Sequence, residues 1–151
     1  MNDPKSIASL PNLSINDTSQ WTVLVVDDEP DNREIAQTVL SFGGVKVQTA
    51  VNGADGIKLL ETISPTFVLL DLSMPVMDGW EMLKLVRANP KTQNIPIIAL
   101  TAHAMAGDRE RVFEAGFDGY IAKPFRIGSF MPELISCLRK FMERGKMPVV
   151  K

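Results

Sequence analysis

The fold is decided by the stretch WTVLVVDD, residues 21–28, where an apolar run of strand-forming residues ends in the adjacent carboxylates Asp27 and Asp28. Three later apolar runs also end in polar side chains: residues 67–70 in Asp71, residues 97–100 in Thr101, and residues 120–122 in Lys123. Parallel strands bring their carboxyl ends to one edge of a sheet. The sequence therefore predicts three acids, a hydroxyl and an amine gathered at that edge.

The composition indicates one globular domain. The chain has 151 residues, of which 45% are hydrophobic and 23% charged, enough for a proper core. A net charge of -2 gives no electrostatic reason to expect nucleic-acid binding. Cys137 is the single cysteine, so an intrachain disulfide is excluded. We find neither a signal peptide nor an apolar run of the ~20 residues that span a bilayer, and therefore expect a cytoplasmic protein without a membrane partner.

Along the chain, we expect a flexible leader over residues 1–20, one domain over residues 21–143 and a tail over residues 144–151. The apolar runs predict strands at 22–26, 46–49, 66–70, 97–100 and 119–122. Helical spacing of apolar residues predicts helices at 31–42, 52–63, 78–88, 106–115 and 129–143. The last helix is expected to begin near Ser129, because Pro132 then falls in its first turn.

Five strand–helix units in succession predict a doubly wound α/β fold with a single five-stranded parallel sheet and five helices. In the flavodoxin-like strand order 2-1-3-4-5, ligands bind at the carboxyl ends of the first and third strands. Those strands end in Asp27–Asp28 and in Asp71. Motif positions and topology thus point to the same place.

Three neighbouring carboxylates need a counter-charge, and Mg²⁺ prefers such oxygen ligands. We expect Asp28 and Asp71 to be direct ligands, Asp27 to bind directly or through water, and the backbone carbonyl of Ser73 to complete the set. Lys123 would pair with Asp71 and later with a phosphoryl oxygen, while the Thr101 hydroxyl donates to the same oxygen. Asp71 is then a nucleophile for phosphoryl transfer, and its product is an acyl phosphate.

Four motifs, taken together in this order, resemble the CheY-like receiver domain of two-component response regulators. They are residues 27–29 (DDE), 71–79 (DLSMPVMDG), 100–102 (LTA) and 120–125 (YIAKPF). The resemblance covers roughly residues 21–142. It implies that Asp71 is the phosphoacceptor, that Asp27 and Asp28 are the acidic metal pair, that Thr101 and Lys123 sense the phosphoryl group, and that Tyr120 is the switch aromatic.

The resemblance also implies partners. The phosphoryl donor would be a phosphohistidine on a sensor histidine kinase or on a histidine phosphotransfer protein. No output domain follows the last expected helix, so we expect a stand-alone receiver rather than a turnover enzyme. It would relay the phosphoryl group or bind a downstream protein through the surface formed by the expected helix 106–115, strand 119–122 and helix 129–143. It would act as a monomer or a phosphorylation-dependent dimer.

Other interpretations of these residues remain. A haloacid-dehalogenase-type phosphatase uses Asp-x-Asp, but the second position here is Ser73. An FMN-binding flavodoxin needs a glycine- and hydroxyl-rich loop after its first strand, where this chain has acids that repel phosphate. A phosphorylation-independent scaffold would not need Asp71 and Lys123. The resemblance implies that Ser73 and His103 influence how water reaches the phosphoryl group; alternatively, His103 is a solvated histidine with no role.

Overall fold

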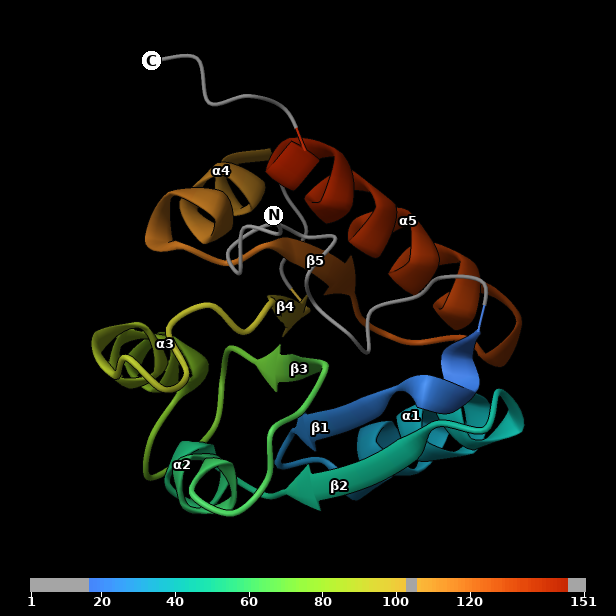
Figure 1. The fold of residues 1–151 in the computed structure, drawn as a ribbon, viewed down its shortest axis with the longest axis horizontal. Helices are drawn as coiled ribbons and strands as arrows, with labels where there is room; N and C mark the ends of the chain where they lie inside the picture. Colours follow the sequence, from blue (N-terminus) through green and yellow to red (C-terminus); the bar gives the residue numbers. More distant parts are fainter. Residues whose placement is uncertain (1–16, 103–105, 147–151) are drawn as a thin grey trace, which may run out of the picture.

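The computed structural model describes residues 17–102 and 106–146. Within these ranges, five strands form one parallel sheet in the order β2-β1-β3-β4-β5, which confirms the predicted fold (Figure 1). The strands are β1 (Thr22–Val26), β2 (Lys46–Ala50), β3 (Phe67–Asp71), β4 (Ile97–Thr101) and β5 (Gly119–Ala122). The helices are α1 (Pro30–Phe42), α2 (Gly53–Leu60), α3 (Gly79–Ala88), α4 (Ala106–Ala115) and α5 (Ile127–Lys146), and a short 3-10 turn, η2 (Thr18–Gln20), precedes β1.

Helices cover both faces of the sheet. Leu40 of α1 and Leu138 of α5 share one buried cluster on the first face. Met82 of α3 and Val112 of α4 belong to a second cluster on the opposite face, against which Ile57 of α2 also packs. Strand side chains alternate between these two clusters, as the pleat of a strand requires. Each strand residue between the two layers is therefore buried whichever way it points.

The inner strands and the edge strand differ in burial as their sequences predict. Every residue of β3 and of β4 is buried, and their runs are continuously apolar. In β2, residues alternate between exposed and partly buried until Ala50, which is buried. The alternating sequence of β2 predicted an edge strand, and β2 does lie at one edge of the sheet.

The last helix is longer than predicted at both ends. It begins at Ile127 rather than near Ser129, because the amides of Ser129 and Phe130 already bond to the Arg126 carbonyl. Pro132 therefore lies inside α5, beyond its first turn. Proline has no amide proton, so the carbonyl of Gly128 receives no hydrogen bond from position 132. This side of the helix is exposed, and water can donate to that carbonyl instead. The expected tail begins later than residue 144, since α5 extends to Lys146.

The expected leader is partly structured. Its last residues form η2, and the Thr18 hydroxyl donates a hydrogen bond to the Gly43 carbonyl beyond α1. Residues 1–16 and 147–151, which make up most of the expected leader and tail, lie outside the described residues. No helix in the described ranges is both long enough and apolar enough to cross a membrane.

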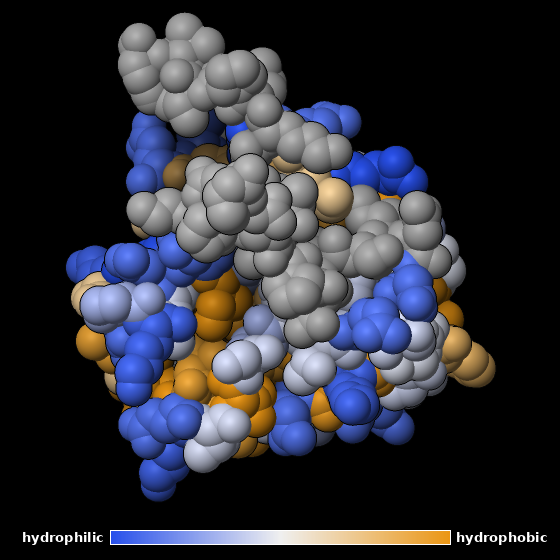
Figure 2. All heavy atoms as spheres, in the orientation of Figure 1, coloured by the Kyte–Doolittle hydropathy of each residue, from blue (hydrophilic) through white to orange (hydrophobic). Residues whose placement is uncertain are grey.

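In Figure 2, hydrophobic side chains gather at the lower left, and a groove lies there between α2 and α3. Ile57, Leu60 and Leu85 contribute to its lining, and Leu85 is exposed. The groove lies beside the carboxyl ends of α2 and α3, since Glu61 and Asn89 also line it. It is therefore separate from the edge of the sheet where the strands end.

Gly79 allows the start of α3 to touch the end of β3. A Cβ atom on Gly79 would lie 2.3 Å from the Asp71 carbonyl oxygen and 2.9 Å from the Leu72 Cα atom. The Gly79 amide also donates to the Leu72 carbonyl at 3.1 Å. Because the opposing atoms belong to the backbone, a side chain at position 79 would displace the strand end that carries Asp71.

The Gly79→Ala variant is therefore expected to lose about 3 kcal/mol or more of its free energy of unfolding, as measured by urea denaturation. The matched control is Gly128→Ala in α5, where a Cβ atom would meet nothing within 4 Å. That control should be unchanged or slightly stabilised, because alanine is the better helix former. Equal stability of Gly79→Ala and wild type would contradict the close contact.

Candidate functional site

The polar strand ends meet at the carboxyl edge of the sheet. Asp27 directly follows β1, and Asp71 is the last residue of β3 and pairs in register with Leu100. Thr101 ends β4 in register with Ala122, and Lys123 follows β5. The structure thus brings together the four polar positions that the strand pattern predicts. This edge includes the topological switch point of the sheet, where the strand order reverses between β1 and β3.

Three carboxylates form a tight cluster. Asp27, Asp28 and Asp71 each place one oxygen within 4.8 Å of the others. Asp27 is fully buried and Asp71 is 3% exposed, whereas Asp28 faces solvent. The cluster therefore combines two acids hidden from water with one acid at the entrance.

Backbone groups hold the two buried acids in place. The amide of Glu29 donates to Asp27 Oδ1 at 2.9 Å, and the amide of Ser73 donates to Asp71 Oδ1 at 3.2 Å. The guanidinium of Arg33 in α1 donates to the Asp27 carbonyl at 2.7 Å. Each acid is thus oriented by the loop that follows its own strand. Arg33 connects α1 to the backbone at the end of β1.

Lys123 bridges the two buried acids. Its Nζ atom lies 3.0 Å from Asp27 Oδ2 and 3.1 Å from Asp71 Oδ1. Burial works to lower the pKa of the Lys123 ammonium, but the carboxylates of Asp27 and Asp71 outweigh burial and leave that pKa raised. Lys123 therefore stays charged inside the cluster, as a counter-ion for both acids.

The pKa of Asp71 is raised to about 7. Burial is the main cause and the neighbouring Asp27 charge is the next, while Lys123 and the Ser73 amide pull the pKa back down. One lysine thus compensates only part of the charge of the cluster. A further cation beside Asp71 would lower its pKa and keep the carboxylate ionised.

A cation fits the acids as they stand. Asp27 Oδ2 is buried and accepts no well-aligned hydrogen bond from the described residues, although Lys123 lies close to it. Carboxylate oxygens of this kind are the ligands that hard divalent cations such as Mg²⁺ prefer. Asp27, Asp28 and Asp71 are therefore the side chains that could hold the ion.

The pH dependence of stability follows from the raised pKa of Asp71. Between pH 3.8 and about 7, the folded chain keeps the proton that the unfolded chain has released. Because the folded state binds more protons, its free energy of unfolding falls as pH rises through this range. In metal-free solution we expect wild type to lose about 1–3 kcal/mol relative to Asp71→Asn over that interval.

Urea unfolding of both proteins across this pH range measures the difference. Mg²⁺ requires ionised carboxylates, so it should stabilise wild type more above pH 7 than below it. If the free energy of unfolding depended on pH in the same way in both proteins, Asp71 would not be the cause of the pH dependence.

An open cleft of about 410 Å³ gives access to the acids. Asp28, Asp71, Ser73, Thr101 and Lys123 all contribute to its lining. Asn32, in the first turn of α1, lines the same cleft from the outer side. A phosphoryl group entering here would meet Asp71, Thr101 and Lys123 together.

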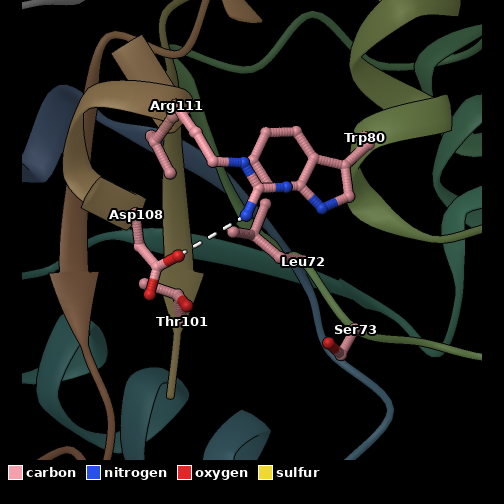
Figure 3. A pocket seen from close by; sticks show the side chains of 7 residues that line it. Leu72, Ser73, Trp80, Thr101, Asp108 and Arg111 are labelled. Carbon is pink, nitrogen blue, oxygen red and sulfur yellow. Dashed lines mark hydrogen bonds and ion pairs between the residues drawn. The ribbon is translucent and has the colours of Figure 1, made fainter. Parts of the chain in front are cut away.

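A second cavity of about 310 Å³ adjoins the cleft and shares Leu72, Ser73 and Thr101 with it. In Figure 3, the guanidinium of Arg111 from α4 lies against the indole of Trp80 from α3. The Arg111 Cζ atom is 5.3 Å from the centre of the Trp80 ring, and Asp108 lies 3.5 Å from the guanidinium. Thr101 therefore lines both the cleft that holds Asp71 and the cavity where Arg111 of α4 meets Trp80 of α3.

Tyr120 lies on β5 and does not line the cleft that holds Asp71. It is partly buried, its ring and the Phe113 ring meet edge to face, and the guanidinium of Arg109 lies over it. Tyr120, the expected switch residue, is therefore on β5, whereas Asp71, the expected phosphoacceptor, is on β3. Tyr120 is not part of the acid cluster. His103 lies outside the described residues.

Sequence reasoning missed three contributors to the site. Arg33 and Asn32 sit among other polar residues of an amphipathic helix, and nothing in their spacing separates them from a solvated face. Gly79 stands inside a recognised motif, but its close contact with the Asp71 carbonyl depends on how α3 packs. All three roles arise from tertiary packing, which no local pattern encodes.

Comparisons with known proteins agree with this geometry. A family model described as the response regulator receiver domain matches residues 23–135. The chain is 41% identical to an uncharacterised 14.6 kDa protein of Leptolyngbya boryana, over 70% of this chain and 81% of that protein. It is 30% identical to the polar-differentiation response regulator DivK of Brucella anthropi, over 78% of this chain and 95% of the relative. The chain spans about half the length of several other curated relatives.

Among solved structures, the receiver domain of a sensor histidine kinase from Pseudomonas aeruginosa PAO1 is 32% identical, with a TM-score of 0.70. The match covers 82% of this chain and 98% of that domain, which holds a magnesium ion in its active-site cleft.

A doubly wound sheet with buried acids and a lysine at its switch point defines a phosphoacceptor class of signalling domain. This chain belongs to the response regulator receiver domain family and is a component of two-component phosphoryl signalling.

Proposed function

We propose that Asp71 is the phosphoacceptor of this receiver. A carboxylate oxygen of Asp71 attacks the phosphorus of a phosphohistidine, a P–O bond forms, the P–N bond breaks, and the imidazole leaves and takes a proton from solvent. The observation that carries the proposal is the double ion pair of Lys123 with Asp27 and Asp71 beside Thr101 in one open cleft. Positioning and charge balance are what phosphoryl transfer requires of a protein.

The other site residues divide the remaining work. Lys123 moves its charge from the Asp71 carboxylate to a phosphoryl oxygen, and the Thr101 hydroxyl donates to the same group. Asp27, Asp28 and Asp71, with the Ser73 carbonyl, would hold Mg²⁺. When bound, the ion neutralises negative charge shared by the acids and the phosphoryl oxygens.

The readout is a change of surface rather than turnover of a free metabolite. Phosphorylation adds roughly -1.5 to -2 units of charge beside Thr101. Thr101 then moves towards the phosphoryl group and Tyr120 turns inward, which alters the face formed by α4, β5 and α5. Ser73 at the position of the second acid of dehalogenase-type phosphatases supports this assignment over a hydrolytic one.

The partners follow from the same chemistry. The donor is a sensor histidine kinase or a histidine phosphotransfer protein, and the acceptor is a downstream protein or the next relay member. We expect the chain to act in the cytoplasm as a monomer or as a phosphorylation-dependent dimer.

Incubation with acetyl phosphate and Mg²⁺ tests the proposal directly. Intact-mass spectrometry should show the addition of a single phosphoryl group, and peptide mapping should place it on Asp71. Chelation of the metal should suppress the addition. Modification of another residue, or modification independent of metal, would overturn the assignment.

A further inference from the structure

A groove of about 570 Å³ lies between the carboxyl halves of α2 and α3. Its apolar lining consists of Ile57 and Leu60 from α2, Leu85 and Ala88 from α3, and Pro90 beyond α3. Hydrophobic side chains gather over this part of the surface in Figure 2, and Leu85 is 46% exposed. The α2–α3 groove, defined by these five residues, therefore leaves apolar surface in water that an apolar segment would cover.

The groove begins where the close packing of α2 ends. A Cβ atom on Gly53 would lie 2.7 Å from Met77 Cγ, and a Cβ atom on Gly56 would lie 2.8 Å from Met82 Cε. Both glycines belong to the amino half of α2, whereas the groove starts at Ile57. The two helices thus meet closely at one end and leave the groove at the other.

The groove has no excess of charge of one sign. Glu61 and Lys91 are its charged lining residues, one of each sign. The exposed charged side chains of the two helices are also of both signs: Asp55, Lys58, Glu81 and Lys84. No surface potential therefore selects a charged partner, and apolar contact decides what binds.

The leader offers a segment of matching chemistry. Residues 6–16 read SIASLPNLSIN and contain no charged side chain, and every third residue from Ile7 to Leu13 is a large apolar one: Ile7, Leu10 and Leu13. A polyproline II helix has three residues per turn, so this spacing places the three side chains on one face of such a segment. Pro11 suits that conformation and would interrupt an α-helix.

The leader is long enough to reach the groove. The described chain begins at Asp17, five residues before Thr22, and the Thr22 amide donates to the Thr66 hydroxyl at 3.0 Å. Thr66 follows Glu61 of the groove by five residues, so the path from Asp17 to Glu61 is at most about 40 Å long. The straight line is shorter than this path, and an extended chain covers about 35 Å between Asp17 and Ile7.

We propose that residues 7–13 of the leader bind the α2–α3 groove of the same chain. Ile7, Leu10 and Leu13 pack against the apolar lining that includes Leu60 and Leu85. The bound leader covers surface that apolar segments of other chains would otherwise contact. The groove is separate from the edge of the sheet that carries Asp71, so this contact goes beyond the phosphoacceptor function and leaves the cleft open.

A spin label on the leader tests the proposal in the full chain. The label is attached to Asn12→Cys in a Cys137→Ser background, which leaves a single thiol, and methyl signals are recorded by NMR. The Leu60 and Leu85 signals should lose most of their intensity while the label is paramagnetic. The signal of Ile135, which packs on the other face of the sheet, should be retained. Undiminished Leu60 and Leu85 signals, or equal loss at all three residues, would overturn the proposal.

Matched pairs of variants assign the contact to named residues. Leu10→Asp and Leu85→Asp should each restore the Leu60 signal, because the contact would bury an unpaired carboxylate. Ser14→Asp adds the same charge off the apolar face of the leader, and Phe42→Asp replaces an 86% exposed side chain at the end of α1, outside the groove. Both controls should keep the signal loss. Restoration by Phe42→Asp but not by Leu85→Asp would place the leader on α1 and refute the groove as its site.

A mixed sample distinguishes binding within one chain from binding between two. Spin-labelled chains without isotopes are mixed with isotope-labelled chains that carry no spin label. The Leu60 and Leu85 signals should keep their intensity in this mixture, and loss there would show that the leader binds a second copy instead of its own chain. Within one chain, the signal loss should persist at high salt, because neither surface carries an excess of charge. Abolition by salt would contradict the apolar basis of the contact.

Discussion

The Asp71→Asn variant is expected to take up no phosphoryl group from acetyl phosphate under conditions that modify wild type fully. Asparagine keeps the size of the side chain but has no anionic oxygen to attack phosphorus. Lys123 keeps its ion pair with Asp27, and the introduced amide keeps an oxygen to accept from the Ser73 amide, so the cleft should retain its shape. Intact-mass spectrometry and beryllofluoride titration followed by tryptophan fluorescence both measure the loss.

The matched control for this variant is Asp31→Asn. Asp31 is an exposed acid in the first turn of α1, close in sequence to the acidic pair but outside the cluster. Its replacement should leave phosphorylation unchanged. If Asp71→Asn were modified to the same extent as wild type, the nucleophile would be another residue and the assignment would be wrong.

The Lys123→Ala variant is expected to lower the rate of phosphorylation by roughly a hundredfold, an effect in the range measured for removal of one group that stabilises developing charge. It should still bind Mg²⁺, because the three carboxylates remain and have lost a competing cation. Its phosphorylated or beryllofluoride-bound form should lose much of the conformational response, since no ammonium remains to follow the phosphoryl oxygen.

Stopped-flow fluorescence measures that rate, and amide chemical shifts with and without beryllofluoride measure the response. Lys84→Ala, which removes an exposed lysine from α3, is the control. Chemical-shift changes in Lys123→Ala as large as those in wild type would show that Lys123 does not couple the site to the surface.

The fold was predictable because its strands are continuous apolar runs with polar terminators. β1 and β5 have the bounds that the sequence predicts, and β3 and β4 each end one residue later, at Asp71 and at Thr101. Those terminators mark the carboxyl edge, so the sheet order and the place of the acids follow from one pattern. Backbone preferences and burial agree at each of these positions.

The remaining details depend on contacts between distant segments. The start of α5 at Ile127 is set by amides that bond to Arg126, whereas the sequence pointed to a later start because of Pro132. Lys123 reaches Asp27 as well as Asp71, which strand order alone does not specify. Arg109 and Arg111 of α4 contact the rings of Tyr120 and Trp80, although arginines at such spacing usually form a solvated helix face.

The proposed magnesium site at the buried acids would link the abundance of this protein to the ionic state of its surroundings. An ion that binds only the folded chain shifts the folding equilibrium by mass action. A fall in free magnesium would therefore enlarge the unfolded fraction on which proteases act. Cells short of the ion would hold less of this signalling protein as well as a less reactive one, so that supply and responsiveness decline together.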